Sequence, residues 1–229
     1  MMEPTFRDRA VIVGETLVVA DLHFGRERSS NVELSLGSDA SMCDRIGTLL
    51  DAHDPAEVVI AGDALHSFDS LPPGVASAFA DLRASVADHG ADLIITPGNH
   101  DVLLDAVWDG ATPDSYALAD GETVVLHGHD PPASSAERYL IGHDHPAIEI
   151  EGQRRPCYLH GVDAYRGSDV VVLPSFNDLV AGVRINQMRA ADFHSPLIQN
   201  ASAFRPIVRD EKAAETLEFP PLGSLREML

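Results

Sequence analysis

Five short apolar runs in this chain each end in a polar cluster that contains Asp, Asn or His. The stretches are TLVVADLH (16–23), EVVIAGDALH (57–66), DLIITPGNHD (92–101), TVVLHGHD (123–130) and RYLIGHDHP (138–146). Short runs rich in Val, Ile and Leu are typical of buried strands. We therefore expect a sheet core whose strand ends carry chemically active side chains, and this feature restricts the fold more than any other.

Two amphipathic helices are expected between these runs. The first lies within residues 40–55 and ends before Pro55, and the second lies within 72–90, where Gly90 is a plausible C-cap. A strand–helix–strand unit of this kind predicts a parallel strand pair with a right-handed crossover. The apolar faces consist of Met42, Ile46, Leu49 and Leu50, and of Val75, Phe79, Leu82 and Val86.

Glycine-centred turns between apolar runs predict antiparallel hairpins elsewhere. They lie within residues 9–21, 116–128 and 147–161, and the stretch 169–185 adds one or two further strands. The result is a mixed α/β fold of about nine to twelve strands.

The length of 229 residues allows one large domain or two small ones, and we expect a single domain over 1–229. Its polar clusters fall within 21–145, and 146–229 is expected to complete a second sheet and wrap the core. Residues 190–229 have a poorer pattern and end in a short expected helix. Segment 29–39 is the best candidate for a mobile loop over a site.

The charge balance is strongly acidic. Acidic residues number 36 against 16 basic ones, of which only Lys212 is a lysine, and the net charge is −20. Carboxylates spread along a chain with almost no lysine suggest a halophilic protein, one that lives in high salt; the alternative is an ordinary acidic cytosolic protein. Such a charge argues against loose binding to nucleic acid or anionic membranes at low ionic strength, although concentrated salt weakens that argument.

The cysteines and the apolar runs indicate the compartment. Cys43 and Cys157 are isolated, so we expect both to be reduced and buried. The first ten residues show no apolar leader, and no apolar run approaches the roughly 20 residues that span a bilayer. We expect a cytoplasmic protein with no membrane partner.

The polar clusters form a coherent set, because ligands of open α/β sheets bind beyond the carboxyl ends of the strands. An i, i+2 pair in an extended chain points both side chains to one side, so DLH can bind one ion, whereas the pair in GHDH can reach two. Glycines 62, 98, 128 and 142 suit close backbone approach. The candidate residues are Asp21, His23, Asp63, Asn99, His100, His127, His143 and His145.

A charge count indicates what such a site binds. Two divalent ions bring +4, Asp21 and Asp63 neutralise two units, and His and Asn are neutral ligands, which leaves about +2. A site of that charge attracts an anion such as phosphate. Oxygen and nitrogen ligands without thiolate suit Mn, which we take as the first choice, or Fe, Zn, Co or Ni.

The order of these blocks resembles the calcineurin-like metallophosphoesterase superfamily, whose pattern runs D-x-H, G-D, G-N-H-D/E, H and G-H-x-H. DLH, GD, GNHD, HGH and GHDH occur in that order over residues 21–145. GDALHSF, the GHDHP ending and LPSFNDLVAG resemble most closely the ICC-like subgroup, which includes DNA-ligase-associated enzymes.

The resemblance implies a fold, a site and partners. The fold is a four-layer αββα sandwich of two mixed sheets flanked by helices. His100 would lie beside the substrate as a catalytic residue that either steadies the transition-state charge or protonates the leaving alkoxide, and Asp101 would orient its ring. A functional link to a DNA ligase or helicase follows from the subgroup alone. The implied ligands are Asp21, His23 and His145 for the first ion, Asn99, His127 and His143 for the second, and Asp63 as the bridge between them.

The leading hypothesis is hydrolysis of a phosphoester, with a diester favoured by the subgroup. Alternatives are a phosphomonoesterase or nuclease on the same site, a non-catalytic metal-binding interaction module, and a structural protein with one metal. Arg26 and His66 are candidate substrate contacts, against a surface role for Arg26 and a supporting or solvent-exposed role for His66. His129 and His194 are interpreted as an outer-shell residue and a surface residue.

Overall fold

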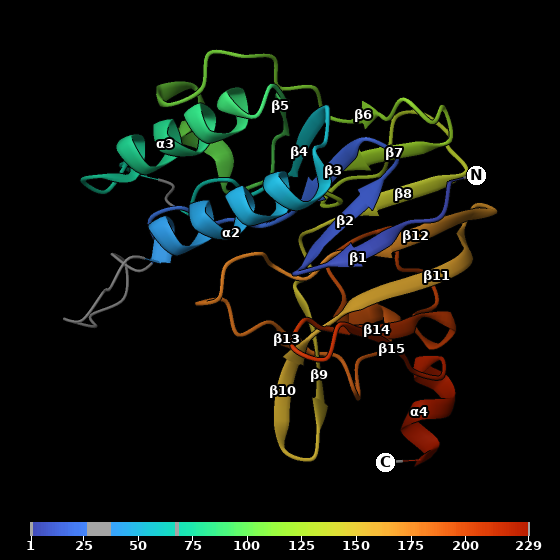
Figure 1. Ribbon diagram of the computed structural model, residues 1–229. Coiled ribbons are helices and arrows are strands. Elements are labelled where there is room, and N and C mark those ends of the chain that lie inside the picture. Colours follow the sequence, from blue (N-terminus) through green and yellow to red (C-terminus); the bar gives the residue numbers. More distant parts are fainter. Residues whose placement is uncertain (1, 27–37, 67–68, 229) are drawn as a thin grey trace.

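The computed structural model describes residues 2–26, 38–66 and 69–228. Residues 29–37 of the predicted mobile loop lie outside this set. Figure 1 shows two large sheets, with α2 and α3 on one side and α4 at the far end of the chain. Within the described residues, no helix combines the length and apolarity needed to cross a membrane.

The first sheet has five strands in the order β1-β2-β3-β4-β5. β1 to β3 are antiparallel neighbours, as the predicted hairpin requires, whereas β3, β4 and β5 run parallel, with Val19 opposite Ile60 and Ile60 opposite Ile95. The strands are β1 (Thr5–Arg7), β2 (Ala10–Val13), β3 (Thr16–Val19), β4 (Glu57–Ala61) and β5 (Asp92–Thr96).

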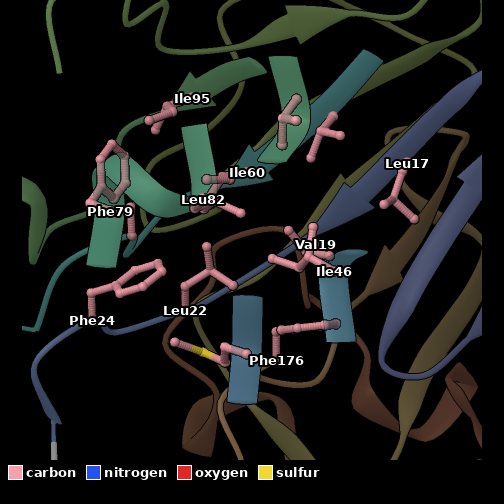
Figure 2. Close-up of a cluster of buried hydrophobic side chains, with 14 of the residues drawn as sticks. Leu17, Val19, Leu22, Phe24, Ile46, Ile60, Phe79, Leu82, Ile95 and Phe176 are labelled. Carbon is pink, nitrogen blue, oxygen red and sulfur yellow. The ribbon is translucent and has the colours of Figure 1, made fainter. Parts of the chain in front are cut away.

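Helices α2 (Ser38–His53) and α3 (Val75–Asp88) connect the parallel strands. All four apolar positions predicted for α3 are buried, and Gly90 follows the helix with a left-handed φ of 76°. The helices pack against the outer face of the sheet through a core that includes Ile46, Ile60 and Leu82 (Figure 2). Both predicted helices are therefore confirmed.

The second sheet has seven strands in the order β15-β14-β11-β12-β8-β7-β6, and β7, β8 and β12 are its parallel centre. A small sheet of order β10-β9-β13 extends from it. The strands are β6 (Tyr116–Ala117), β7 (Thr123–Leu126), β8 (Arg138–Ile141), β9 (Pro146–Ile150), β10 (Gln153–Pro156), β11 (Tyr158–Tyr165), β12 (Ser168–Val172), β13 (Val183–Arg184), β14 (Arg205–Asp210) and β15 (Glu215–Glu218).

The two large sheets pack face to face, and side chains such as Val18, Val59, Val125 and Leu140 form the layer between them. The outer face of the second sheet is covered by a separate apolar cluster that includes Phe204. The predicted four-layer α/β sandwich is confirmed. Its fourth layer is less regular than expected, and consists of the short 3₁₀ helices η2 (Ala190–Asp192) and η3 (Ala201–Ala203) and of α4 (Leu222–Met228).

The described residues form fifteen strands, more than the nine to twelve expected. The excess comes from very short strands and from the β14–β15 hairpin. Every residue of β15 is exposed, so its sequence shows no apolar alternation. Cys157 is buried, Cys43 is partly buried, and both are free thiols, as expected except for the partial exposure of Cys43.

Candidate metal centre

Four predicted ligands meet between the carboxyl ends of the two sheets. The side-chain ligand atoms of Asp21, His23, Asp63 and His145 all lie within 4.8 Å of one another. His145 Nε2 lies 3.2 Å from Asp21 Oδ1 and 3.3 Å from His23 Nε2. Two carboxylates and two imidazoles converging at this range form a donor set suited to a divalent cation. We call them the first ligand group.

A second group surrounds the ring of His127. Its Nε2 lies 3.1 Å from Asn99 Oδ1, 3.1 Å from His143 Nδ1 and 3.5 Å from Asp63 Oδ1. The other carboxylate oxygen of Asp63, Oδ2, lies 3.8 Å from His23 Nε2 in the first group. Asp63 thus presents one oxygen to each group, which is the geometry of a bridging ligand.

The i, i+2 pairs reach the centre by a different backbone from the one expected. Sequence reasoning placed them in extended chain, but Asp21, His23, His143 and His145 have φ values of 55°, 47°, 71° and 43°. Left-handed backbone is uncommon for residues other than glycine and costs of order 1–3 kcal/mol. Hydrogen bonds hold it: the His23 N–H donates to the carbonyl of Asp63, and the His143 N–H donates to the carboxylate of Asp21.

Two glycines are required by the packing of ligands against backbone. A Cβ added to Gly62 would lie 2.2 Å from Nδ1 of His127, and one added to Gly98 would lie 2.1 Å from Oδ1 of Asp63. Both distances are far below contact. The prediction that these glycines allow close approach is confirmed at both positions.

Burial sets the protonation of the imidazoles. It lowers the pKa of His23 and His143 to about 3 and that of His127 to about 4. Neutral imidazole is the form that binds metals. Burial opposes ionisation of both Asp21 and His145, but their mutual attraction outweighs it, so the pKa of Asp21 is lowered and that of His145 is raised.

The raised pKa of Asp63 is the clearest sign that the centre suits a positive charge. Burial and then repulsion by Asp21 raise its pKa to about 8. Two buried carboxylates are unfavourable side by side unless a cation lies between them. The residues present therefore fit divalent metal ions, which the resemblance also implies.

His100 and Asp101 follow Asn99 at the end of β5. The backbone N–H of His100 donates to Asp63 Oδ1 at 2.9 Å, and its Nε2 lies 3.9 Å from Asp63 Oδ2. Burial lowers the pKa of His100, opposed by a hydrogen bond with the backbone of His66. The ring is thus at the edge of the first ligand group.

Asp101 contacts backbone. Its two carboxylate oxygens accept hydrogen bonds from the N–H groups of Leu65 and Gly98, at 2.9 and 2.8 Å. These bonds join the loops after β4 and β5. The orientation of the His100 ring by Asp101 stays a prediction.

The ring of His66 stacks on that of His100, with centroids 5.9 Å apart, and lies edge-on to His23 at 5.3 Å. Burial, followed by repulsion from Arg26, lowers the pKa of His66. Both predicted substrate contacts therefore lie on the side of the first ligand group. Their contact with substrate stays a prediction.

Sequence reasoning missed part of the pocket over the ligands. A pocket of about 400 Å³ includes Met188, Asp192 and His194 beside the ligand histidines. Asp144 anchors this segment, because its carboxylate accepts hydrogen bonds from the N–H groups of His194 and Ser195 at 2.8 and 3.1 Å. His194 is exposed, as interpreted, but its ring lies 5.8 Å from that of His143.

A second support comes from the loop after β12. Ser175 Oγ donates to the carbonyl of Asp21 at 2.7 Å, and Asn177 Nδ2 donates to the carbonyl of Leu22 at 2.8 Å. Both side chains are buried. The polar pair in LPSFND, directly after an apolar run, is the sequence signal for this role.

The family of the chain follows from comparison with known proteins. The profile of the family described as calcineurin-like phosphoesterase matches residues 15–173. A nuclease MPE from Pseudomonas putida is 23% identical, with a TM-score of 0.62 over 91% of this chain and 96% of its own. Yfce, a phosphoesterase from E. coli, is 14% identical, with a TM-score of 0.47 over 90% and 98%. No curated protein matches the sequence.

Proposed function

The chain belongs to the calcineurin-like phosphoesterase family, and from that premise we propose that it hydrolyses phosphodiesters with two divalent metal ions. The observation that carries the proposal is the division of the ligands into two groups that share Asp63. Asp21, His23 and His145 would hold the first ion, and Asn99, His127 and His143 the second. We propose manganese as the ion at both positions.

The chemistry divides between the ions and the side chains. When bound, a pair of ions clamps phosphoryl oxygens and lowers the pKa of water. Water adds to phosphorus, the bond from phosphorus to the leaving oxygen breaks, and the leaving alkoxide needs a proton. His100 lies beside Asp63 at the edge of the centre, and we assign it to donate that proton.

Asp101 is proposed as a positioning residue. Its bonds to the Gly98 and Leu65 N–H groups fix the loop that carries Asn99 and His100. Arg26 and His66 are proposed to contact the phosphate from the side of the first ligand group. Each of these roles can be tested by a single substitution.

A diester is favoured over a monoester for two reasons. The motifs GDALHSF and LPSFNDLVAG resemble those of the ICC-like subgroup, and the structural neighbour from Pseudomonas putida is a nuclease, an enzyme that cleaves diesters. The acidic, lysine-poor composition supports activity in concentrated salt and an archaeal, halophilic origin. A cytoplasmic location and a link to a DNA ligase or helicase stay predictions.

The test compares bis-p-nitrophenyl phosphate with p-nitrophenyl phosphate in molar KCl with Mn(II). We expect turnover of the diester to exceed that of the monoester and to vanish in Asp63→Asn. Preference for the monoester would keep the metal mechanism but reject the diester. Absence of turnover for both substrates, in protein that contains two metals, would reject the enzyme proposal.

A further inference from the structure

A second pocket, of about 410 Å³, gathers positive charge in an otherwise acidic protein. Its lining carries four cationic side chains against three carboxylates, whereas the whole chain has 16 basic and 36 acidic residues. By contrast, the pocket beside His129 is lined by Asp114 and Asp130 and by neither lysine nor arginine. The four cationic residues of this basic pocket are Arg9, Arg155, Arg209 and Lys212.

The strand registers place the basic pocket at the same end of the sandwich as the metal centre. β2 is antiparallel to β3, with Val11 opposite Val18, so the β1–β2 turn that holds Arg9 lies at the carboxyl end of β3. β11 is antiparallel to β12, and β14 is antiparallel to β11, so Arg155 and Arg209 lie at the carboxyl end of β12. The pocket therefore flanks the metal centre on the side away from β5.

Two of the cationic side chains are fixed and two are exposed. Arg9 pairs with Asp178 at 2.6 Å, and Arg209 pairs with Glu211 at 2.9 Å. The side chain of Arg155 is 44% exposed and lies 3.8 Å from Asp210, and Lys212 is also exposed. The fixed pair shapes the wall, and the exposed pair is positioned to turn toward an anion.

The wall of the basic pocket is also joined to the metal centre. Arg9 Nη1 donates to the carbonyls of Ser175 and Asn177, both at 3.2 Å. The side chains of those two residues hold the carbonyls of Asp21 and Leu22. One loop thus fixes the distance between the pocket and the first ligand group.

We propose that the basic pocket binds a backbone phosphate of a nucleic-acid strand whose scissile diester lies at the metal centre. This inference rests on the proposed function and names its substrate class. The pocket lies about two strands from β3, a displacement on the order of 10 Å. A strand that spans this displacement places the bound phosphate within a few nucleotides of the scissile one.

The test uses Arg155→Gln/Lys212→Gln, because both side chains are exposed and their loss leaves the core intact. Arg166→Gln is the control for loss of a surface cation, since it removes one exposed positive charge at the β11–β12 turn, at the opposite end of the sheet. Hydrolysis of a single-stranded oligonucleotide and of bis-p-nitrophenyl phosphate is measured with Mn(II) over a series of KCl concentrations.

The double variant is expected to raise the oligonucleotide KM about tenfold and to reduce the slope of log KM against log salt by about 1–2. Its kinetics on bis-p-nitrophenyl phosphate, and both activities of Arg166→Gln, should match wild type. An oligonucleotide KM that is unchanged in the double variant would overturn this inference and leave the proposed function intact. The same holds if the wild type cleaves only the small diester. Loss of both wild-type activities would overturn the proposed function and this inference with it.

Discussion

The two sheets contribute different chemistry to the candidate metal centre. The five-stranded sheet supplies every oxygen ligand, from Asp21, Asp63 and Asn99, whereas the seven-stranded sheet supplies only imidazoles, from His127 and His143 together with His145. Each ligand group draws on both sheets. The carboxylates of the five-stranded sheet thus set the charge of the centre, and the imidazoles of the seven-stranded sheet complete each ligand group. A bound ion would link the two sheets.

The largest effect is expected where one residue serves both groups. Asp63→Asn removes the bridging charge, and we expect turnover of bis-p-nitrophenyl phosphate to fall by at least about 10²–10³-fold, with both metals lost by elemental analysis. Asp92→Asn removes an exposed carboxylate at the amino end of β5 and should retain activity. Two tightly held metals in Asp63→Asn would argue against a bridge.

His100→Ala separates proton transfer from metal binding. We expect it to keep both metals and lose about 10²–10⁴-fold in turnover of an alkyl diester. The loss should be smaller for a p-nitrophenyl leaving group, which departs readily without a proton. Equal losses on both substrates would contradict proton donation by His100.

Asn99→Asp gives the second ligand group a carboxylate of its own. The centre then carries about +1 in place of +2, so we expect both metals to stay bound while KM for the anionic substrate rises about tenfold. Asn99→Ala is the paired variant and should lose one metal per chain. A lower KM in Asn99→Asp would contradict the charge count.

A metal ion bound between the two sheets should raise the thermal stability of the protein. Mn(II) at about 100 times its dissociation constant should add about 2.7 kcal/mol to the free energy of unfolding, which for a chain of this size raises Tm by roughly 5–10 °C. The increase should be reduced in both Asp21→Asn and His145→Ala, one variant from each sheet. An increase lost in only one of them would assign the ion to a single sheet.

The smallest effect concerns the regular helical layer over the five-stranded sheet. His89, after α3, donates a hydrogen bond from Nδ1 to the carbonyl of Ser85 and one from Nε2 to the carboxylate of Asp51 in α2, and these two contacts, the Ser85 contact first, raise its pKa. A raised pKa means that this stabilisation is present below the unfolded pKa of about 6.5 and is lost as pH rises through the folded pKa.

Urea midpoints at about pH 5.5 and about pH 8.5 test this contact. The stability difference between wild type and Asp51→Asn should be larger at the lower pH. An equal difference at both pH values would show that protonation of His89 does not strengthen its contact with Asp51.

The sequence predicted the parts of the molecule that an apolar pattern marks. The five ligand-bearing strands are short continuous apolar runs, and the buried residues of α3 recur every three to four positions. The grouping of ligands also followed, because parallel strands end at one edge. The assignment of each residue to an ion stays a prediction.

Features that no apolar pattern marks in the sequence were not predicted. The left-handed backbone of Asp21 and His23 could not be predicted from the sequence, because their hydrogen-bond partners lie on the loops after β4 and after β12. The role of Asp101 could not be read from its residue type, because only the fold brings the Leu65 N–H to its carboxylate. β15 is exposed throughout, so no burial pattern marks it.

The central claim is that two ions share Asp63 between the sheets. The most direct test is crystallography of the Mn(II)-loaded protein with anomalous scattering. The account predicts two peaks about 3.5–4 Å apart, one bound by Asp21, His23 and His145, the other by Asn99, His127 and His143, with Asp63 bound to both. A single peak, or two peaks without Asp63 between them, would contradict it.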